Sequence, residues 1–223
     1  MADLFFNIVD WEQNPLSSKK FRTQCKNTLN EYGALVLEEF LNPSAIDSIR
    51  KEGAENQHLA HFTKTNHNIY LSPTDPKFPS YHPRNREVVS SKGCITTDQI
   101  PESSNLRILY AAQVFQEFLC AVLDIEELYE YADPLSSINL HYASEGQELG
   151  WHFDNSSFAI TLMIQAPKEG GKFEYVKDVR DSNLNDMNFS LSEKVLDGKL
   201  LPKTLAMDVG SLARMTGWKA SRV

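Results

Sequence analysis

The chain has 223 residues and a formal net charge of −8 at pH 7. This length suits one domain with a sizeable core, and the acidic balance argues against nucleic acid and anionic membrane as partners. Cys25, Cys94 and Cys120 lie far apart without a C-x-x-C pair, so the sequence predicts neither a disulfide framework nor a zinc ribbon.

The amino-terminal residues lack both the basic and the continuous apolar segment of a secretion signal. No apolar run approaches the roughly 20 residues that a transmembrane helix requires. We therefore expect a cytoplasmic protein without membrane contact, in which the cysteines serve packing in a reducing compartment.

Residues 1–57 predict a layer made of a helix, a strand and a second helix. Ser18 can cap a helix that Gly33 stops, and residues 34–37 are apolar enough for a buried strand. Asn42 and Pro43 then provide an N-cap and a first-turn proline for the second helix.

Residues 58–104 predict a long loop, because prolines and scattered polar residues break every period. Long loops in compact domains are often functional, and we interpret this one as a lid over an active-site mouth. Arg84 or Arg86 would be available there to pair with a substrate carboxylate in fork geometry. A solvated loop without substrate contact is the alternative.

Residues 105–132 contain the longest helical pattern of the chain. Apolar residues recur at helical spacing from Asn105 to Tyr131 and form a wide stripe. Such a stripe indicates core packing, so we expect one helix that backs a sheet.

The one constellation with chemical character is His152-Phe153-Asp154. Segments 137–142, 158–166 and 172–176 predict strands of an antiparallel meander around it. Residues two apart on an extended chain project to the same face, so the imidazole and the carboxylate can grip one ion. These are two legs of the facial triad that holds non-haem Fe(II); a surface His beside a surface Asp is the alternative.

The pattern N-x-H-Y…G-W-H-F-D-N…L-M-I-Q…G-G-x-F-x-Y, within residues 139–175, resembles the core of the Fe(II)- and 2-oxoglutarate-dependent oxygenases. Within them it is most similar to the bacterial group that hydroxylates or halogenates free amino acids. The resemblance runs from about residue 30 to 212. It implies a single α+β domain in which residues 137–223 form a double-stranded β-helix, a cupin-like jelly roll, buttressed by the amino-terminal and central helices.

The same resemblance implies the chemistry. His152 and Asp154 would hold Fe(II), and oxidative decarboxylation of 2-oxoglutarate by O2 would drive oxidation of a small molecule, expected to be a free amino acid. Halogenating relatives replace the carboxylate with a small residue so that chloride can bind. Since Asp154 is present, we predict a hydroxylase.

Further site residues follow from the resemblance and from strand alternation. A polar residue on the strand before the His-x-Asp pair often contacts 2-oxoglutarate in the family, which makes Asn139, His141 and Tyr142 candidates. Alternation puts Asn139 and His141 on one face and Tyr142 on the other, so we choose the first two and keep Tyr142 as the substitute. His141 is also an alternative third metal ligand. Asn155 joins the two arginines as a candidate substrate contact.

The carboxyl-terminal part departs from the family pattern. Residues 204–210 predict a further strand, after which the family supplies a second iron-binding His and an Arg for the far carboxylate of 2-oxoglutarate. No His follows His152, and Ser221 or a gap stands where that His is expected. We therefore expect incomplete distal strands. The alternatives to an active oxygenase are a truncated or catalytically impaired homologue and a cupin-like barrel that binds a metal or small ligand without 2-oxoglutarate.

Overall fold

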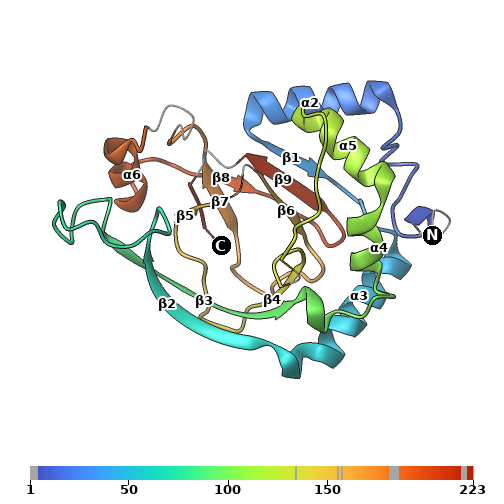
Figure 1. Ribbon diagram of the computed structural model, residues 1–223, viewed down its shortest axis with the longest axis horizontal. Coiled ribbons are helices and arrows are strands. Elements are labelled where there is room, and N and C mark those ends of the chain that lie inside the picture. Colours follow the sequence, from blue (N-terminus) through green and yellow to red (C-terminus); the bar gives the residue numbers. More distant parts are fainter. Residues whose placement is uncertain are drawn as a thin grey trace.

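The computed structural model describes residues 5–133, 135–154, 156, 158–180, 186–216 and 220–222, and it combines helices with antiparallel sheets (Figure 1). The elements in chain order are α2 (Lys19–Tyr32), β1 (Ala34–Leu37), α3 (Pro43–Asn56), η1 (Gln57–Leu59), β2 (His61–Asn68), β3 (Glu87–Thr96), η2 (Thr97–Gln99), α4 (Asn105–Ala111), α5 (Gln113–Leu123), β4 (Asn139–Tyr142), β5 (His152–Phe153), β6 (Phe158–Leu162), β7 (Phe173–Val176), α6 (Phe189–Leu196), β8 (Lys203–Leu205), β9 (Leu212–Thr216) and β10 (Ala220–Arg222).

The amino-terminal layer is as predicted. The Ser18 side chain accepts a hydrogen bond from the Phe21 amide at the start of α2, and Gly33 ends the helix in the left-handed conformation, with φ of 71°. Asn42 is the N-cap of α3 and Pro43 is its first residue. Figure 1 shows α2 and α5 beside the sheet that contains β1.

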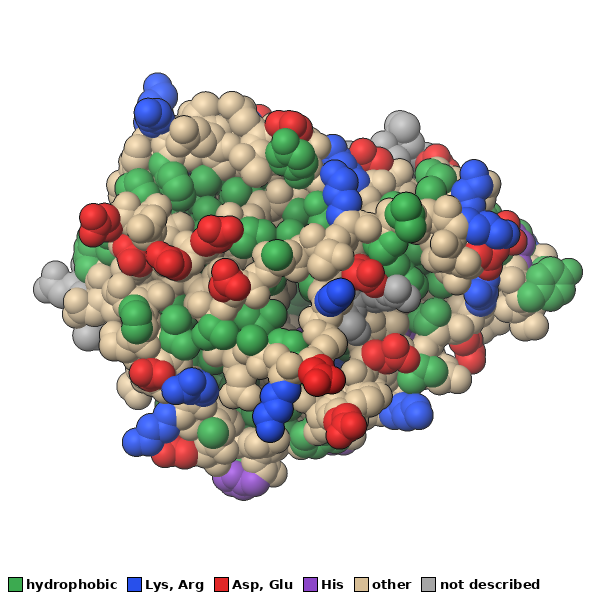
Figure 2. All heavy atoms as spheres, turned by 180° about the vertical axis from the view of Figure 1, so that it is seen from behind, with side chains coloured by type: hydrophobic (Ala, Val, Ile, Leu, Met, Phe, Trp, Pro, Cys, Tyr) green, Lys and Arg blue, Asp and Glu red, His purple; other side chains and the backbone are tan. Residues whose placement is uncertain are grey.

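The strands form three antiparallel sheets, ordered β1-β9-β6, β5-β10-β7-β8 and β2-β3-β4. Figure 1 shows them arranged around the middle of the molecule, with α2 to α5 on one side and α6 on the opposite side. The site described below lies on β5 and faces β3 and β4. From behind, Figure 2 shows a surface that is hollowed near its middle, with acidic side chains gathered to one side of the hollow.

Two apolar clusters fix this arrangement. In the larger one, Leu35 of β1 and Leu212 of β9 pack with buried side chains of the helices such as Phe115 and Phe118. In the second cluster, Trp151 and Phe153 join residues that lie beside α6; the other buried members are Ile69, Tyr70, Val179 and Val195. The second cluster therefore anchors the segment that carries the His-x-Asp pair.

The prediction of a loop throughout residues 58–104 is wrong. β2 and β3 pair over eight residues, from His61 with Cys94 to Asn68 with Glu87, and β4 continues the sheet. The side chains of β2 are mostly polar and exposed. The apolar alternation by which a strand is recognised in sequence is therefore missing, and backbone pairing with β3 is the main interaction that forms the strand.

The predicted continuous helix over 105–131 is also wrong in its extent. It is divided at Ala112 into α4 and α5, and it ends at Asp124, which adopts a left-handed φ of 59°. No single helix of the described residues is long and apolar enough to cross a membrane; α4 and α5 would qualify only as a pair, which is bent by 56°.

The predicted strand over 204–210 is split. β8 ends at Leu205, and β9 begins only after Gly210, whose φ of 88° makes the turn. A Cβ at Gly210 would lie 2.5 Å from the Ile46 side chain, so the turn also packs against α3. Helix α6 was not predicted from the sequence. Part of the predicted polar loop before it, residues 181–185, lies outside the described residues.

The helix layer should unfold readily when its aromatic centre is removed. Phe118 is 1% exposed and its ring lies 6.0 Å from that of Phe21. We expect Phe118→Ala to lower the free energy of unfolding by about 3–5 kcal/mol, measured by urea denaturation. Tyr81→Ala, at a side chain that is 79% exposed, is the control and should change it by less than about 0.5 kcal/mol. Equal losses in the two variants would contradict this packing.

Candidate functional site

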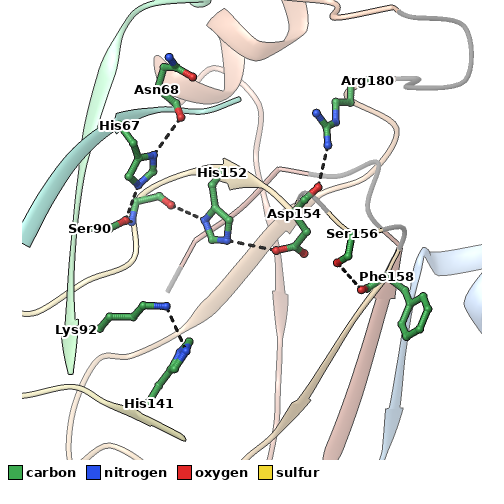
Figure 3. A network of polar contacts seen from close by, with 11 residues as sticks. His67, Asn68, Ser90, Lys92, His141, His152, Asp154, Ser156, Phe158 and Arg180 are labelled. Atoms are coloured by element: carbon green, nitrogen blue, oxygen red, sulfur yellow. Dashed lines mark hydrogen bonds and ion pairs between the residues drawn. The ribbon is translucent and has the colours of Figure 1, made fainter. Parts of the chain in front are cut away.

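The short strand β5 carries one candidate metal ligand, His152, and the other, Asp154, follows directly after the strand (Figure 3). Phe153 is fully buried, its ring packs 5.3 Å from that of Tyr70, and its amide donates to the Ile69 carbonyl over 2.8 Å. Because side chains alternate along a strand, the burial of Phe153 turns its two neighbours, His152 and Asp154, to the opposite face.

His152 and Asp154 do converge. The Nε2 atom of His152 lies 3.5 Å from an Oδ1 atom of Asp154, and their side chains are 20% and 23% exposed. The Nδ1–H of His152 donates to the Gly150 carbonyl over 2.8 Å, which directs Nε2 toward the carboxylate. A backbone carbonyl on the second ring nitrogen is the usual arrangement of a metal-binding histidine.

The ionisation of His152 reflects competing influences. Burial lowers its pKa, but the hydrogen bond to Asp154, the Gly150 carbonyl and the charge of Asp154 together outweigh burial and leave the pKa raised. The positive charge of Lys92 acts in the lowering direction. Without a metal the pair therefore favours a proton between the two side chains, which is where a cation would bind.

The hairpin of β2 and β3 holds Gly150 in place. The Ser90 hydroxyl accepts from the Gly150 amide over 2.9 Å and lies 2.6 Å from Nε2 of His67. A Cβ at Gly150 would lie 2.5 Å from the Val89 carbonyl oxygen, so no larger residue fits without a shift. Sequence reasoning missed this support, because its residues lie about 60 positions before the residues that they position.

Arg180 is a second contributor that the sequence did not indicate. Its Nη2 donates to the Asp154 carbonyl over 2.9 Å, and its guanidinium lies 4.4 Å above the Phe153 ring. Burial lowers the Arg180 pKa, while the charge of Asp154 acts against that change. Arg180 thus fixes the end of β5 through the Asp154 carbonyl and the Phe153 ring, on the side of the second apolar cluster.

The predicted 2-oxoglutarate contacts divide between two faces. Asn139 and His141 project from the same face of the sheet as Cys94 of β3. The Cys94 thiol donates to Oδ1 of Asn139 over 3.4 Å. On the same face, Lys92 Nζ lies 3.2 Å from Nε2 of His141. Tyr142 points the other way, toward α3, and its hydroxyl donates to the Gly53 carbonyl over 2.7 Å. Alternation along β4 therefore removes the substitute candidate, Tyr142, from the side of His152.

His141 stays neutral at ordinary pH. Desolvation by the surrounding protein first, and then the charge of Lys92, lower the pKa of His141 to about 4, although the residue remains partly open to solvent. Its Nε2 is occupied by the Lys92 ammonium, so the structure does not bring His141 to His152 as a third ligand. No group of three or more His, Cys, Asp and Glu is arranged for metal binding within the described residues.

The predicted substrate residues meet different fates. Arg86 pairs with Asp197 over 2.5 Å and donates to the Leu196 carbonyl over 3.1 Å, so it fastens the end of α6 and is not available for a carboxylate. Arg84 lies 6.0 Å over the Tyr70 ring, and its Nη1 is buried without a partner. Asn155 lies outside the described residues. The lid was predicted over residues 58–104, and whether the part of it between β2 and β3, residues 69–86, covers the site stays a prediction.

Strand β10 passes directly beside the ligand pair. Its residue Ser221 is the backbone partner of His152, and Ala220 is the partner of Phe153. The position at which the resemblance expects a second histidine is therefore next to His152 in space, and the chain has serine there.

Comparison with known proteins gives the family. Residues 17–200 match the family described as Halogenase D. The chain belongs to the Halogenase D family. Among solved structures, an oxidoreductase of the 2OG-Fe(II) oxygenase family from Burkholderia pseudomallei is similar, with a TM-score of 0.58 over 92% of this chain and 84% of that chain. At 11% identity this likeness shows a shared fold. No curated protein matches the chain.

The glycine that positions His152 in this Halogenase D family member offers a direct test. We expect Gly150→Ala to push β5 away from β3, to cost about 1–3 kcal/mol of stability as overpacking does, and to weaken Mn(II) binding measured by isothermal titration calorimetry. Gly170→Ala strains a left-handed residue with open space around it and is the matched control, which should leave metal binding unchanged. Wild-type metal affinity in Gly150→Ala would contradict this role.

The neutral state of His141 predicts a pH dependence. Its pKa of about 4 in the folded protein lies below the ordinary 6.5. Between these two pH values the histidine is protonated in the unfolded chain but neutral in the folded protein. The free energy of unfolding therefore falls as the pH decreases through this range. We expect His141→Asn to lose less stability than wild type between about pH 7 and about pH 5 in urea denaturation. An unchanged acid loss in His141→Asn would be the contrary result.

Proposed function

We propose that this chain is an Fe(II)- and 2-oxoglutarate-dependent oxygenase that hydroxylates a small molecule, with a free amino acid as the expected substrate. The observation that carries the proposal is the convergence of His152 and Asp154 on one face of β5. Membership in the Halogenase D family and the fold shared with a 2OG-Fe(II) oxygenase support the same chemistry.

The two side chains fit a divalent ion. His152 Nε2 and Asp154 Oδ1 lie 3.5 Å apart, and a histidine nitrogen with a carboxylate oxygen is a donor set that would hold Fe(II). The tautomer that the Gly150 carbonyl fixes leaves Nε2 to bind the ion. When bound, Fe(II) would activate O2, which oxidises 2-oxoglutarate to succinate and CO2 and supplies the oxygen atom for the substrate.

Asp154 favours hydroxylation over halogenation. By resemblance, halogenating relatives have a small residue at this position, which gives chloride access to the metal. Here the carboxylate faces Nε2 of His152 and its backbone carbonyl is held by Arg180. Asp154 would therefore occupy the place that chloride needs, and it would bring a negative charge that repels a halide.

The arrangement of the sheets supports the finer fold assignment. We infer that β4 to β10 correspond to a double-stranded β-helix, because β5 pairs with the distant β10 and β6 pairs with the distant β9. Such long-range antiparallel pairing folds the chain over on itself and places the His-x-Asp segment beside the last described strand.

An impaired homologue is the second candidate function. The observation that favours it is Ser221 as the backbone partner of His152, since the described residues then offer two protein ligands to the metal. Metal content after purification separates this candidate from the first: a homologue without metal affinity would serve only as a binding fold.

To test the proposal, the purified protein is first loaded with Fe(II) under anaerobic conditions. Then 2-oxoglutarate, O2 and one amino acid at a time are added in the presence of chloride. We expect O2 uptake and succinate release that depend on 2-oxoglutarate, and a product that has gained one oxygen atom by mass spectrometry. O2 uptake independent of 2-oxoglutarate, or a chlorinated product, would rule out the assignment.

Asp154 should be essential for both metal binding and hydroxylation. Loss of a residue that only supports a metal ligand reduces metal affinity about 10- to 100-fold. We expect Asp154→Gly, which removes a ligand itself, to reduce the affinity further and to abolish hydroxylation. Asp208→Gly removes an exposed carboxylate and is the control. If Asp154→Gly retained the hydroxylation rate and the metal affinity of wild type, Asp154 would have no part in the site.

A further inference from the structure

Lys92 is a cation that faces the site without a carboxylate partner. It lies on β3, its side chain is half-buried, and no Asp or Glu within the described residues forms an ion pair with it. Its one polar contact there is Nε2 of His141, at 3.2 Å. This contact is open to solvent, so the positive charge of Lys92 is accessible to a ligand that enters from solution.

The partner that Lys92 does have cannot neutralise it. Since His141 accepts from the ammonium, its Nε2 carries no proton, and the pKa of His141 near 4 keeps it neutral at ordinary pH. An ammonium has three N–H donors, and His141 uses one of them. His141 therefore holds Lys92 in one orientation while leaving both its charge and two donors available.

Lys92 is aimed at the same space as the metal ligands. Figure 3 shows Lys92 and His141 below His152, with Asp154 alongside. Arg180 contacts Asp154 through the backbone carbonyl, on the other side of β5. Lys92 is thus the ammonium on the His141 side of the ligand pair.

We propose that Lys92, oriented by His141, binds an organic carboxylate in the space in front of His152 and Asp154. The inference rests on the proposed function, which supplies two carboxylates: the far carboxylate of 2-oxoglutarate and the carboxylate of an amino-acid substrate. Both make the same charge-assisted hydrogen bonds to an ammonium. Neither Arg84 nor Arg86 faces Lys92 in any described contact, so this site is separate from the one predicted on the lid.

The test measures binding without turnover. The protein is saturated with Mn(II), which supports no oxidation here, and 2-oxoglutarate and the common L-amino acids are titrated one at a time by isothermal titration calorimetry. We expect Lys92→Met to weaken binding of one of these carboxylates roughly 10- to 100-fold, as loss of a charged hydrogen bond does. Lys92→Arg should restore part of it, because the charge returns.

Lys64→Met is the matched control. On the neighbouring strand β2, Thr63 pairs with Lys92, and Lys64 is the next residue. Because side chains alternate along a strand, Lys64 lies on the opposite face of the sheet from Lys92. This variant removes the same charge from the same sheet and should leave all affinities unchanged. Thermal unfolding of each variant shows whether the fold is retained.

The outcomes separate the two carboxylates and the two proposals. Weaker binding of 2-oxoglutarate to Lys92→Met assigns the site to the cosubstrate, and weaker binding of an amino acid assigns it to the substrate. If wild type binds these ligands and Lys92→Met binds them equally well, the Lys92 site is overturned while the oxygenase proposal stands. If wild type binds none of them, both fall.

Discussion

The burial of Phe153 is the constraint on which the site depends. Its ring is fully enclosed between Tyr70 and the Arg180 guanidinium, and exposing it would cost the apolar contacts of the second cluster. Because successive side chains of a strand alternate, the burial of Phe153 places the side chains of His152 and Asp154 on the opposite face. The ligand pair is thus aimed by an apolar residue that takes no part in the chemistry.

Charge in the site is distributed around a single carboxylate. Asp154 faces His152, while two cations, Lys92 and Arg180, approach from β3 and from the end of the second cluster. The protein as a whole is acidic, so this local excess of positive charge is set by the fold. It suits ligands that carry carboxylates, and a metal ion bound to the pair would strengthen the preference.

Local sequence rules predicted the parts of the fold whose signals are local. The caps Ser18 and Gly33, and Pro43 at the start of α3, act within a few residues of themselves. Strand β2 was not predicted, because its polar, exposed side chains show no alternation of apolar and polar residues. Its pairing with β3 runs through backbone hydrogen bonds, which side-chain patterns do not reveal. The helix over 105–131 was overextended since its apolar stripe continues through a bend that only packing reveals.

The sequence by itself determined the convergence of His152 and Asp154, because they are two residues apart and the geometry of an extended chain brings them to one face. It also separated Tyr142 from His141, by the same alternation. Only the tertiary structure decided what surrounds them: Ser90 reaches Gly150 across 60 positions and Lys92 reaches His141 across 49. Such contacts depend on strand register between distant segments, which side-chain periodicity within one segment does not encode.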